Sequence, residues 1–368
     1  MRKKLDLAAA ILIGAVFLSL MPWSRMITAE NDFVHFYIGG MLYGHPEIFS
    51  PEANYAKQRE LIGATLPHSF FGRPAFYGLL LKPLALLPYR TAYWIFQLGS
   101  LLCLGVFLKL NWRRYPGLLV LCIMSPALFA NFVNGQDVLY LLLFCSLSLA
   151  ASERGWDFAA GLILSLCAIK AHLFLPVPLA AILWKRWRIL AGGAIGGAGL
   201  FLCSLPGAPV STQLQLVRQL GNPEHSPYPD LMPSLRSLTG DHREFFWLAA
   251  ILVLAGVTVL MRRAQSYEAA FGWALIGGLL ASYHAYVQDC LLLLLALVLV
   301  HRELSKPAKV LLQIAVLPFI YIALAAGYPF SWIFPAVLLA TLACQLLQPV
   351  TNLAIGGTTE NKPQPIPC

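Results

Sequence analysis

The residues best suited to chemistry follow the first long apolar run of the sequence. Asp32 and His35 lie in Asn31-Asp32-Phe33-Val34-His35, where ionisable side chains first gather after the apolar residues 7–20. A carboxylate at such a place can take a proton from an attacking hydroxyl, as a general base does. It can equally cap the helix that follows, because Asp is a preferred N-cap residue. The position of Asp32 alone favours the cap.

Other polar and ionisable residues lie near the ends of later apolar runs. They are Arg73, Asn134, Gln136, Asp137, Lys170, His172, His284, Gln288 and Asp289. Ionisable groups at membrane depth are costly to desolvate and normally face a watery cavity. We therefore expect one cavity built from several segments, and we expect its walls to include His35, Tyr37, Asn134, Gln136, His172, Tyr286 and Asp289.

Each candidate also has a purely structural interpretation. The segment 134–137, Asn-Gly-Gln-Asp, is typical of a tight turn whose Asp caps the next helix. Arg73 could bind lipid headgroups, and His284 could belong to an interfacial belt with its neighbouring tyrosines. Lys170 interrupts an apolar hairpin, where a contact with an anion is favoured over an anchor that snorkels to the surface.

The elements that must position these residues are apolar segments. Of the 368 residues 58% are hydrophobic and 12% are charged, with a mean hydropathy of +0.69, more apolar surface than one soluble core can bury. We predict an all-α, polytopic membrane protein with about twelve transmembrane or re-entrant helices. The segments are 7–21, 89–110, 116–130, 137–151, 158–170, 172–184, 189–205, 244–261, 267–282, 287–301, 308–326 and 330–347. The two between 158 and 184 are short enough to form a re-entrant hairpin.

The charge distribution predicts the orientation. This topology places 16 of the 26 basic residues and 6 of the 17 acidic residues on the side of the N-terminus, for a net charge of +10 there and −1 opposite. By the positive-inside rule both termini are cytoplasmic, in a cell inner membrane. The net charge of +9 thus reflects topology, and we expect membrane lipids and no nucleic acid as partners.

Two long segments are predicted on the non-cytoplasmic side, residues 22–88 and 206–243. In the first, interfacial helices are expected at 32–44, 51–63 and 74–87. Residues 1–355 then form one integral membrane domain, and the polar tail 356–368 is expected to be disordered. The eight cysteines are scattered without metal-ligand spacing, so we expect small core residues and no metal site.

In combination, five motifs resemble those of glycosyltransferase family 87, the polyprenol-phosphate-mannose-dependent mannosyltransferases of the GT-C fold. The resemblance runs from about residue 30 to 300. In chain order the motifs are Asn31-Asp32-Phe33, the segment Phe76-Tyr77 through Lys82-Pro83-Leu84-Ala85-Leu86-Leu87-Pro88, the turn Asn134-Gly135-Gln136, the hairpin from Lys170 to the basic Lys185-Arg186-Trp187-Arg188, and Ser282-Tyr283-His284-Ala285-Tyr286-Val287-Gln288-Asp289. Two departures, Gly72-Arg73-Pro74 for the family's Tyr-Pro-Pro and Tyr283 for a Pro, leave the sugar and the acceptor open.

The resemblance implies an inverting hexosyltransferase that acts on the non-cytoplasmic face, moving a sugar from a polyprenyl-phosphate donor to a hydroxyl of a glycolipid or glycan. It implies Asp32 as general base, and we expect His284 as its catalytic partner and Lys170 and Arg73 as ligands of the donor phosphate. A charge-matched phosphate is a good leaving group, so no cofactor and no metal is expected. Two alternatives stay open at this point: a transporter or flippase of lipid-linked sugars, and a non-enzymatic envelope assembly factor that would not need Asp32, Lys170 and His284 to converge. The oligomeric state and the polyprenol length are not predicted.

Overall fold

The computed structural model describes residues 2–20, 22–66, 69–220 and 228–348, and these residues form helices and no strands. The all-α prediction is therefore confirmed for the described part of the chain. The tail 356–368 lies outside the described residues, as do positions 221–227 of the second predicted loop.

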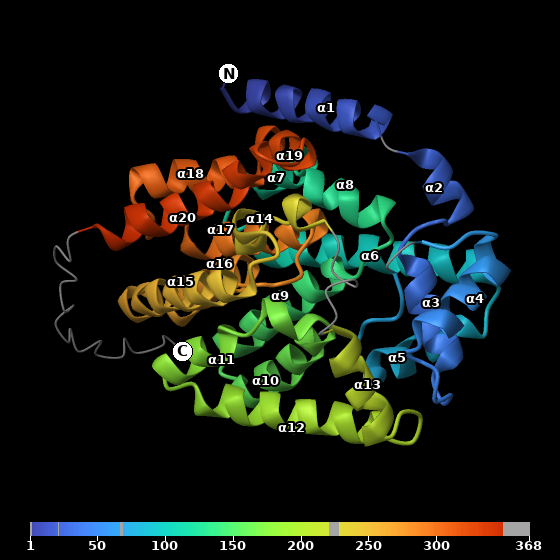
Figure 1. Cartoon of the computed structure of the whole chain (residues 1–368). Helices are drawn as coiled ribbons and strands as arrows, with labels where there is room; N and C mark the ends of the chain where they lie inside the picture. Colours follow the sequence, from blue (N-terminus) through green and yellow to red (C-terminus); the bar gives the residue numbers. More distant parts are fainter. Residues whose placement is uncertain (1, 21, 67–68, 221–227, 349–368) are drawn as a thin grey trace, which may run out of the picture.

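The first part of the chain forms the helices expected between residues 22 and 88. Helices α1 (Arg2–Leu20) and α2 (Trp23–Thr28) precede α3 (Phe33–Leu42), α4 (Pro51–Ile62) and α5 (Ala75–Ala85). Helix α4 begins where its sequence predicts, because the Ser50 hydroxyl accepts a hydrogen bond from the Ala53 amide at 3.2 Å and Pro51 occupies the first turn. Figure 1 shows α3, α4 and α5 gathered at one side of the molecule, with α1 running across its top.

The remaining helices follow in two groups. The first group is α6 (Tyr89–Asn111), α7 (Leu118–Met124), α8 (Pro126–Val133), α9 (Val138–Glu153), α10 (Asp157–Ser165), the 3-10 helix η1 (Leu166–Leu173), α11 (Val177–Leu183) and α12 (Trp187–Ser204). The second group is α13 (Val210–Leu220), η3 (Pro229–Leu231), α14 (Leu235–Thr239), α15 (Arg243–Arg263), α16 (Tyr267–Leu280), η4 (Val287–Leu291), α17 (Leu292–Val300), α18 (Lys306–Val316), α19 (Pro318–Ala325), η5 (Phe330–Trp332) and α20 (Ile333–Leu346).

The helices coincide with the twelve apolar segments, but few are single full-length spans. Among the described residues, three helices are long and apolar enough to cross a membrane, namely α6, α12 and α15. The number rises to five if two bent pairs count as one span each, including α18 with α19, which meet at 59°. Several other segments are broken or short: Pro126 separates α7 from α8, and α9 and α16 have 16 and 14 residues. The count of twelve spans is thus not shown.

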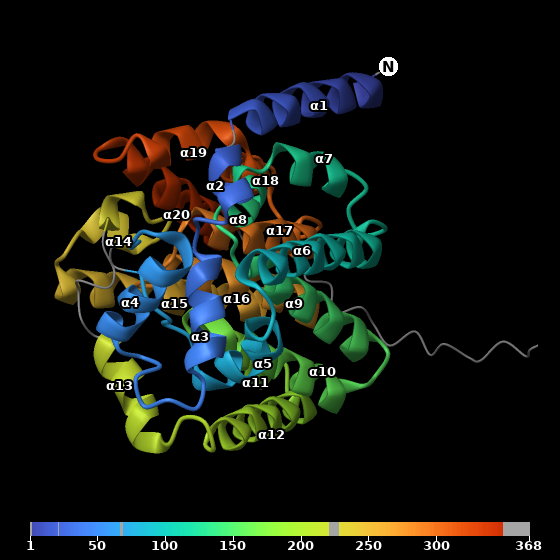
Figure 2. The same cartoon turned by 90° about the vertical axis from the view of Figure 1, so that its right-hand side faces the viewer.

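The core is built on α16 and α17, which Figures 1 and 2 show in the middle of the molecule. Every residue of α17 is buried, and so is every residue of α16 except Glu268 near its N-terminus. A helix that is apolar on all sides must be surrounded by protein or lipid, and here other helices surround it. Apolar side chains are instead exposed on outer helices such as α15, where Phe245, Leu248 and Leu252 are all more than half exposed.

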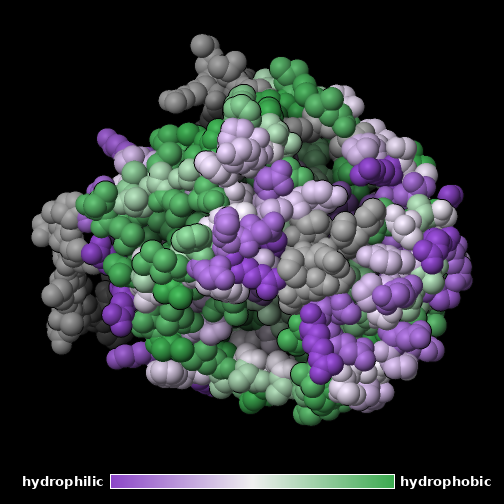
Figure 3. All heavy atoms as spheres, in the orientation of Figure 1, coloured by the Kyte–Doolittle hydropathy of each residue, from purple (hydrophilic) through white to green (hydrophobic). Residues whose placement is uncertain are grey.

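The surface is divided into an apolar part and a hydrophilic part. In Figure 3 apolar side chains cover the left of the molecule, over α15 and α18, whereas hydrophilic side chains gather on the right, over α4 and α13. Exposed apolar belts of this kind are expected where lipid replaces water as the solvent. Several apolar helices and this surface are compatible with a membrane protein.

Candidate active site

One cavity of about 770 Å³ lies where α3, the segment before α5, the turn between α8 and α9, η1 and the turn before η4 approach one another. All but one of the residues predicted for the site line it: Asp32, His35, Arg73, Asn134, Gln136, Lys170, His172, His284, Tyr286 and Asp289. The exception is Tyr37, which is buried in the protein, donates its hydroxyl to the Leu87 carbonyl at 2.7 Å and is not among the residues that line the cavity. The structure instead packs Tyr37 into the core, where its ring lies 5.2 Å from that of Tyr89.

Asp32 immediately precedes α3, in the N-cap position, yet its side chain makes no capping hydrogen bond. Its neighbour Asn31 accepts from the Phe33 amide instead, at 3.2 Å, and donates to the Val133 carbonyl at 3.1 Å. The Asp32 amide donates to the Asn134 carbonyl at 3.1 Å. Asn31, and not Asp32, therefore accepts a side-chain hydrogen bond from the first turn of α3. The Asp32 side chain, about one-third exposed, faces the cavity.

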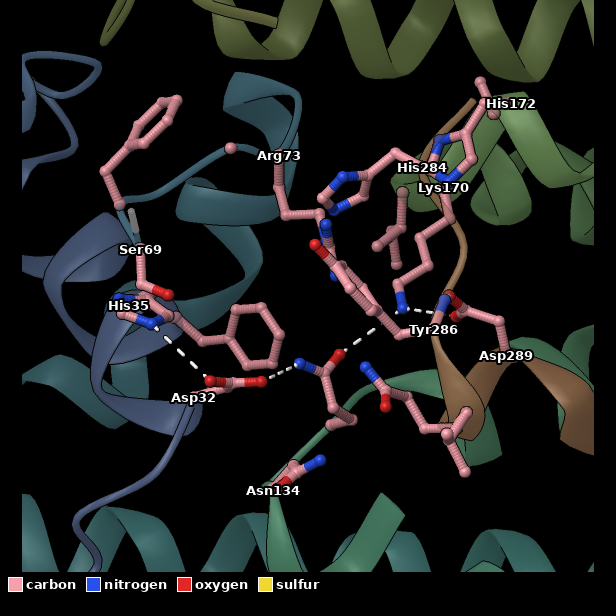
Figure 4. A pocket seen from close by; sticks show the side chains of 18 of the residues that line it. Asp32, His35, Ser69, Arg73, Asn134, Lys170, His172, His284, Tyr286 and Asp289 are labelled. Carbon is pink, nitrogen blue, oxygen red and sulfur yellow. Dashed lines mark hydrogen bonds and ion pairs between the residues drawn. The ribbon is translucent and has the colours of Figure 1, made fainter. Parts of the chain in front are cut away.

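Gln136 holds one oxygen of that carboxylate. Its Nε2 donates to Asp32 Oδ2 at 2.6 Å, and its Oε1 accepts from Lys170 Nζ at 3.3 Å (Figure 4). A carboxylate only accepts and an ammonium only donates, so these two partners permit a single orientation of the amide. Gln136 follows Gly135, whose φ of +60° and whose contact with Asn31 exclude a side chain there.

Two cations and two carboxylates meet behind Gln136. Arg73 Nε donates to Asp137 Oδ2 at 3.0 Å, and Lys170 Nζ lies 2.6 Å from Asp289 Oδ1 and 3.4 Å from Asp137 Oδ1. The Asp137 side chain is completely buried. The two cations, at 3.0 and 3.4 Å from its oxygens, favour the charged form of this carboxylate. The carboxylate is thus ionised, and we call these four residues the ion-pair cluster.

Backbone geometry aims Lys170 into this cluster. At Lys170 the helical path of η1 is interrupted, with φ −128° and ψ 57°. Its side chain is only 4% exposed, and its ammonium is surrounded by acceptors from Asp289, Asp137 and Gln136. Asp289 is oriented in turn by the Tyr286 amide, which donates to its Oδ2 at 2.9 Å. Lys170 therefore neither snorkels nor anchors the hairpin at a surface.

The imidazoles of His172 and His284 meet on the wall opposite Asp32, with ring centroids 6.2 Å apart, and the His284 ring lies 4.9 Å from that of Tyr286. Burial, the neighbouring His172 and the positive charges of Arg73 and Lys170 hold the pKa of His284 well below its usual value. The His284 ring is therefore neutral at pH 7.

The histidine beside Asp32 is His35. Its Nε2 lies 3.8 Å from Asp32 Oδ1, and its Nδ1 lies 3.3 Å from Gln58 Nε2 on α4. The sequence predicts His284 as the catalytic partner of Asp32, and that role of His284 stays a prediction. The only sequence signal for Gln58 is its spacing, because Asn54 and Gln58 are amides four residues apart on one face of a predicted amphipathic helix, and the structure shows both buried.

The structure does not fit three of the alternative interpretations: lipid contact for Arg73, helix capping for Asp137 and an aromatic belt for His284. Arg73 does not reach lipid headgroups, because its side chain is 13% exposed and paired with Asp137. Asp137 occupies an N-cap position without a side-chain capping bond. His284 lines the cavity and does not belong to an exposed aromatic belt.

Among the described residues, no group of three or more His, Cys, Asp or Glu side chains could hold a metal ion. The cysteines described are free, and most of them are buried, as expected of small core residues. Metal independence stays a prediction, since the substrate could supply ligands of its own.

Comparison with known proteins gives one match. The model of glycosyltransferase family 87 matches residues 71–285, more than half of the chain. This range contains Arg73, Gln136, Lys170 and His284, and it begins after Asp32. No curated protein and no solved structure matches the chain.

Proposed function

The chain belongs to glycosyltransferase family 87, and we propose that it moves a sugar, mannose by family resemblance, from a polyprenyl-phosphate donor to an acceptor hydroxyl. The acceptor is a lipid-linked or glycan hydroxyl, the active site faces the extracytoplasmic side of an inner membrane, and both termini are cytoplasmic. The observation that carries the proposal is the position of the Asp32 carboxylate at the cavity. Gln136 donates a hydrogen bond to this carboxylate and accepts one from Lys170, so its amide links the two residues.

In the proposed reaction the acceptor oxygen attacks the anomeric carbon on the face opposite the phosphate. The new C–O bond forms as the bond to the phosphate oxygen breaks, so the configuration inverts and polyprenyl phosphate leaves with the electron pair. Asp32 takes the acceptor's proton as the attack proceeds. Because Gln136 already occupies Oδ2, the oxygen available for this proton is Oδ1.

Arg73 is the cation best placed for the donor phosphate. Its bonds to Asp137 use Nε and Nη2, so the Nη1 group stands outside that pair. A guanidinium can then bridge a carboxylate and a phosphate. Lys170 already has three acceptors around its three N–H groups, so a phosphate contact there requires that Gln136 or Asp137 give up its place. Without such a change, Lys170 acts through its charge.

The decisive experiment uses purified protein in detergent with polyprenyl-phosphate mannose and a lipid-linked glycan acceptor. Asp32→Asn and Asp32→Ala should fold and bind the donor but lose about 10²–10⁴-fold in transfer. Glu30→Gln, which removes an exposed carboxylate two residues away, is the matched control and should behave like the native enzyme. Near-native turnover in either Asp32 variant would show that another group is the base.

Two further measurements test the rest of the proposal. The anomeric configuration of the product, read by NMR, should be opposite to that of the donor. Extensive EDTA treatment should leave transfer unchanged, and a loss that divalent ions restore would refute metal independence.

The same assay separates the alternatives. A carrier of lipid-linked sugars makes no glycosylated product in detergent. The assembly-factor interpretation did not require Asp32, Lys170 and His284 to converge, yet all three line one cavity, which favours the enzyme.

A further inference from the structure

A buried polar atom beside Asp32 has no hydrogen-bond partner. His35 is only 6% exposed, and its Nε2 is buried without a partner among the described residues. The atom lies 3.8 Å from Asp32 Oδ1, longer than a hydrogen bond, and both residues line the cavity (Figure 4). A buried donor or acceptor left unpaired costs stability, so such an atom commonly awaits a ligand.

The protein fixes which nitrogen of His35 carries the proton. Gln58 Oε1 accepts from the Leu66 amide at 2.8 Å, so its Nε2 must be the donor side, and that nitrogen donates to the Ser69 carbonyl at 2.7 Å. The same nitrogen lies 3.3 Å from His35 Nδ1. A donor facing Nδ1 requires an unprotonated Nδ1, which places the proton of the neutral ring on Nε2.

The N–H of His35 thus points towards the same space as the free oxygen of the base. We propose that His35 Nε2–H and Asp32 Oδ1 together bind the reacting hydroxyl of the acceptor, an inference that rests on the proposed function. An oxygen about 2.8 Å from both atoms forms a triangle on their 3.8 Å separation, so a single hydroxyl satisfies both hydrogen-bond distances. The hydroxyl donates its proton to Asp32 and accepts the hydrogen bond of His35.

This arrangement orients the nucleophile. A hydroxyl oxygen has two lone pairs, of which His35 engages one and leaves the other for the anomeric carbon. During attack the proton passes to Asp32, and His35 keeps its own proton throughout. Orientation of this kind lowers the barrier because the reacting atoms are already aligned.

The same geometry selects the class of acceptor. A neutral amine has one lone pair, and once that pair accepts the His35 hydrogen bond none remains for attack. An alcohol keeps one. The site is therefore built for O-glycosyl transfer, and an acceptor with an amine in place of its reacting hydroxyl should be a poor substrate.

The kinetic test compares His35→Leu with His35→Gln, whose amide nitrogen can replace Nε2 as a donor. His35→Leu should raise the KM for the acceptor about tenfold, the cost of one buried hydrogen bond, and leave the KM for the donor within about twofold. His35→Gln should recover most of the acceptor affinity. A native acceptor KM in His35→Leu, while Asp32→Asn remains inactive, overturns this inference alone; activity in Asp32→Asn overturns the proposed function.

The tautomer is tested without any turnover. In protein labelled with ¹⁵N-histidine, the signals of His35 are those that disappear in His35→Gln, and they should show a protonated Nε2 and an unprotonated Nδ1. A protonated Nδ1 in the native protein would refute the assignment even if transfer follows the proposed mechanism.

Discussion

Replacing Asp137 by Asn tests whether the ion-pair cluster is as buried and as tightly paired as the geometry indicates. The variant keeps the size of the side chain but removes one of the two carboxylates that face Arg73 and Lys170, at 3.0 and 3.4 Å. Lys170 retains Asp289 and Gln136, whereas Arg73 loses the carboxylate that pairs with it. The loss in the free energy of unfolding should therefore come mainly from the Arg73 guanidinium, which would be buried without a charged partner.

The size of the effect follows from burial. The side chains of Arg73 and Asp137 are 13% and 0% exposed, and removing one partner of a buried pair costs about 3–5 kcal/mol. We expect the lower end, about 3 kcal/mol, because Arg73 retains some access to water and lies over the Phe36 ring. Removing both charges in Arg73→Met with Asp137→Leu should restore most of that loss, since no charge is then left unpaired.

Unfolding in mixtures of SDS and a mild detergent gives the free energy of unfolding, and thiol labelling of buried residues such as Cys145 and Cys290 gives an independent measure. The matched control is Glu153→Gln, which breaks the partly exposed pair of Arg114 and Glu153 and should cost less than about 1 kcal/mol. If Asp137→Asn costs no more than this control, the cluster is not a buried pair in the sense argued above.

Three further outcomes are expected. Lys170→Ala should weaken donor binding measured by titration, and lost activity at unchanged donor affinity would move Lys170 to another role. Because burial and nearby cations hold the pKa of His284 well below its usual value in the folded protein, the unfolded state binds a proton first as pH falls; the free energy of unfolding should therefore decrease as the pH falls below about 6.5, and His284→Gln should reduce that dependence. Gly135→Ala should destabilise the protein by about 1–3 kcal/mol in the same SDS titration, because φ is +60° and the new Cβ would lie 2.6 Å from Asn31 Oδ1; a native midpoint would contradict this.

The helices could be predicted from the sequence better than the spans. Three of the four helices between residues 22 and 88 begin and end within two residues of the expected ranges, because caps and prolines mark them locally, whereas the short α2 was not predicted. Span length could not be predicted in the same way, because hydropathy depends only on how apolar the residues are and does not reveal where the helical backbone is interrupted. Pro126 and the irregular φ and ψ at Lys170 each interrupt a segment that is apolar throughout.

The site was predictable in its members but not in its pairings. Lys170 and Arg73 were recognisable as costly charges among apolar neighbours, which is a property of the local sequence. That Arg73 pairs with Asp137, and that Gln58 sets the tautomer of His35, depends on residues 64 and 23 positions apart that only tertiary packing brings together. For the same reason the cap interpretation of Asp32 could be discarded only when Asn31 was seen to do that work.

The ion-pair cluster also bears on how a donor reaches the enzyme. The two positive charges of the cluster are balanced by two negative charges, so their electrostatic potential falls off quickly with distance. The cluster therefore exerts no strong long-range attraction on an anionic headgroup. Recognition then depends on short-range hydrogen bonds, and added salt has little to screen. We expect the KM for the donor to stay nearly constant between low and high ionic strength, so that delivery of the substrate is governed by diffusion of the isoprenoid in the plane of the bilayer.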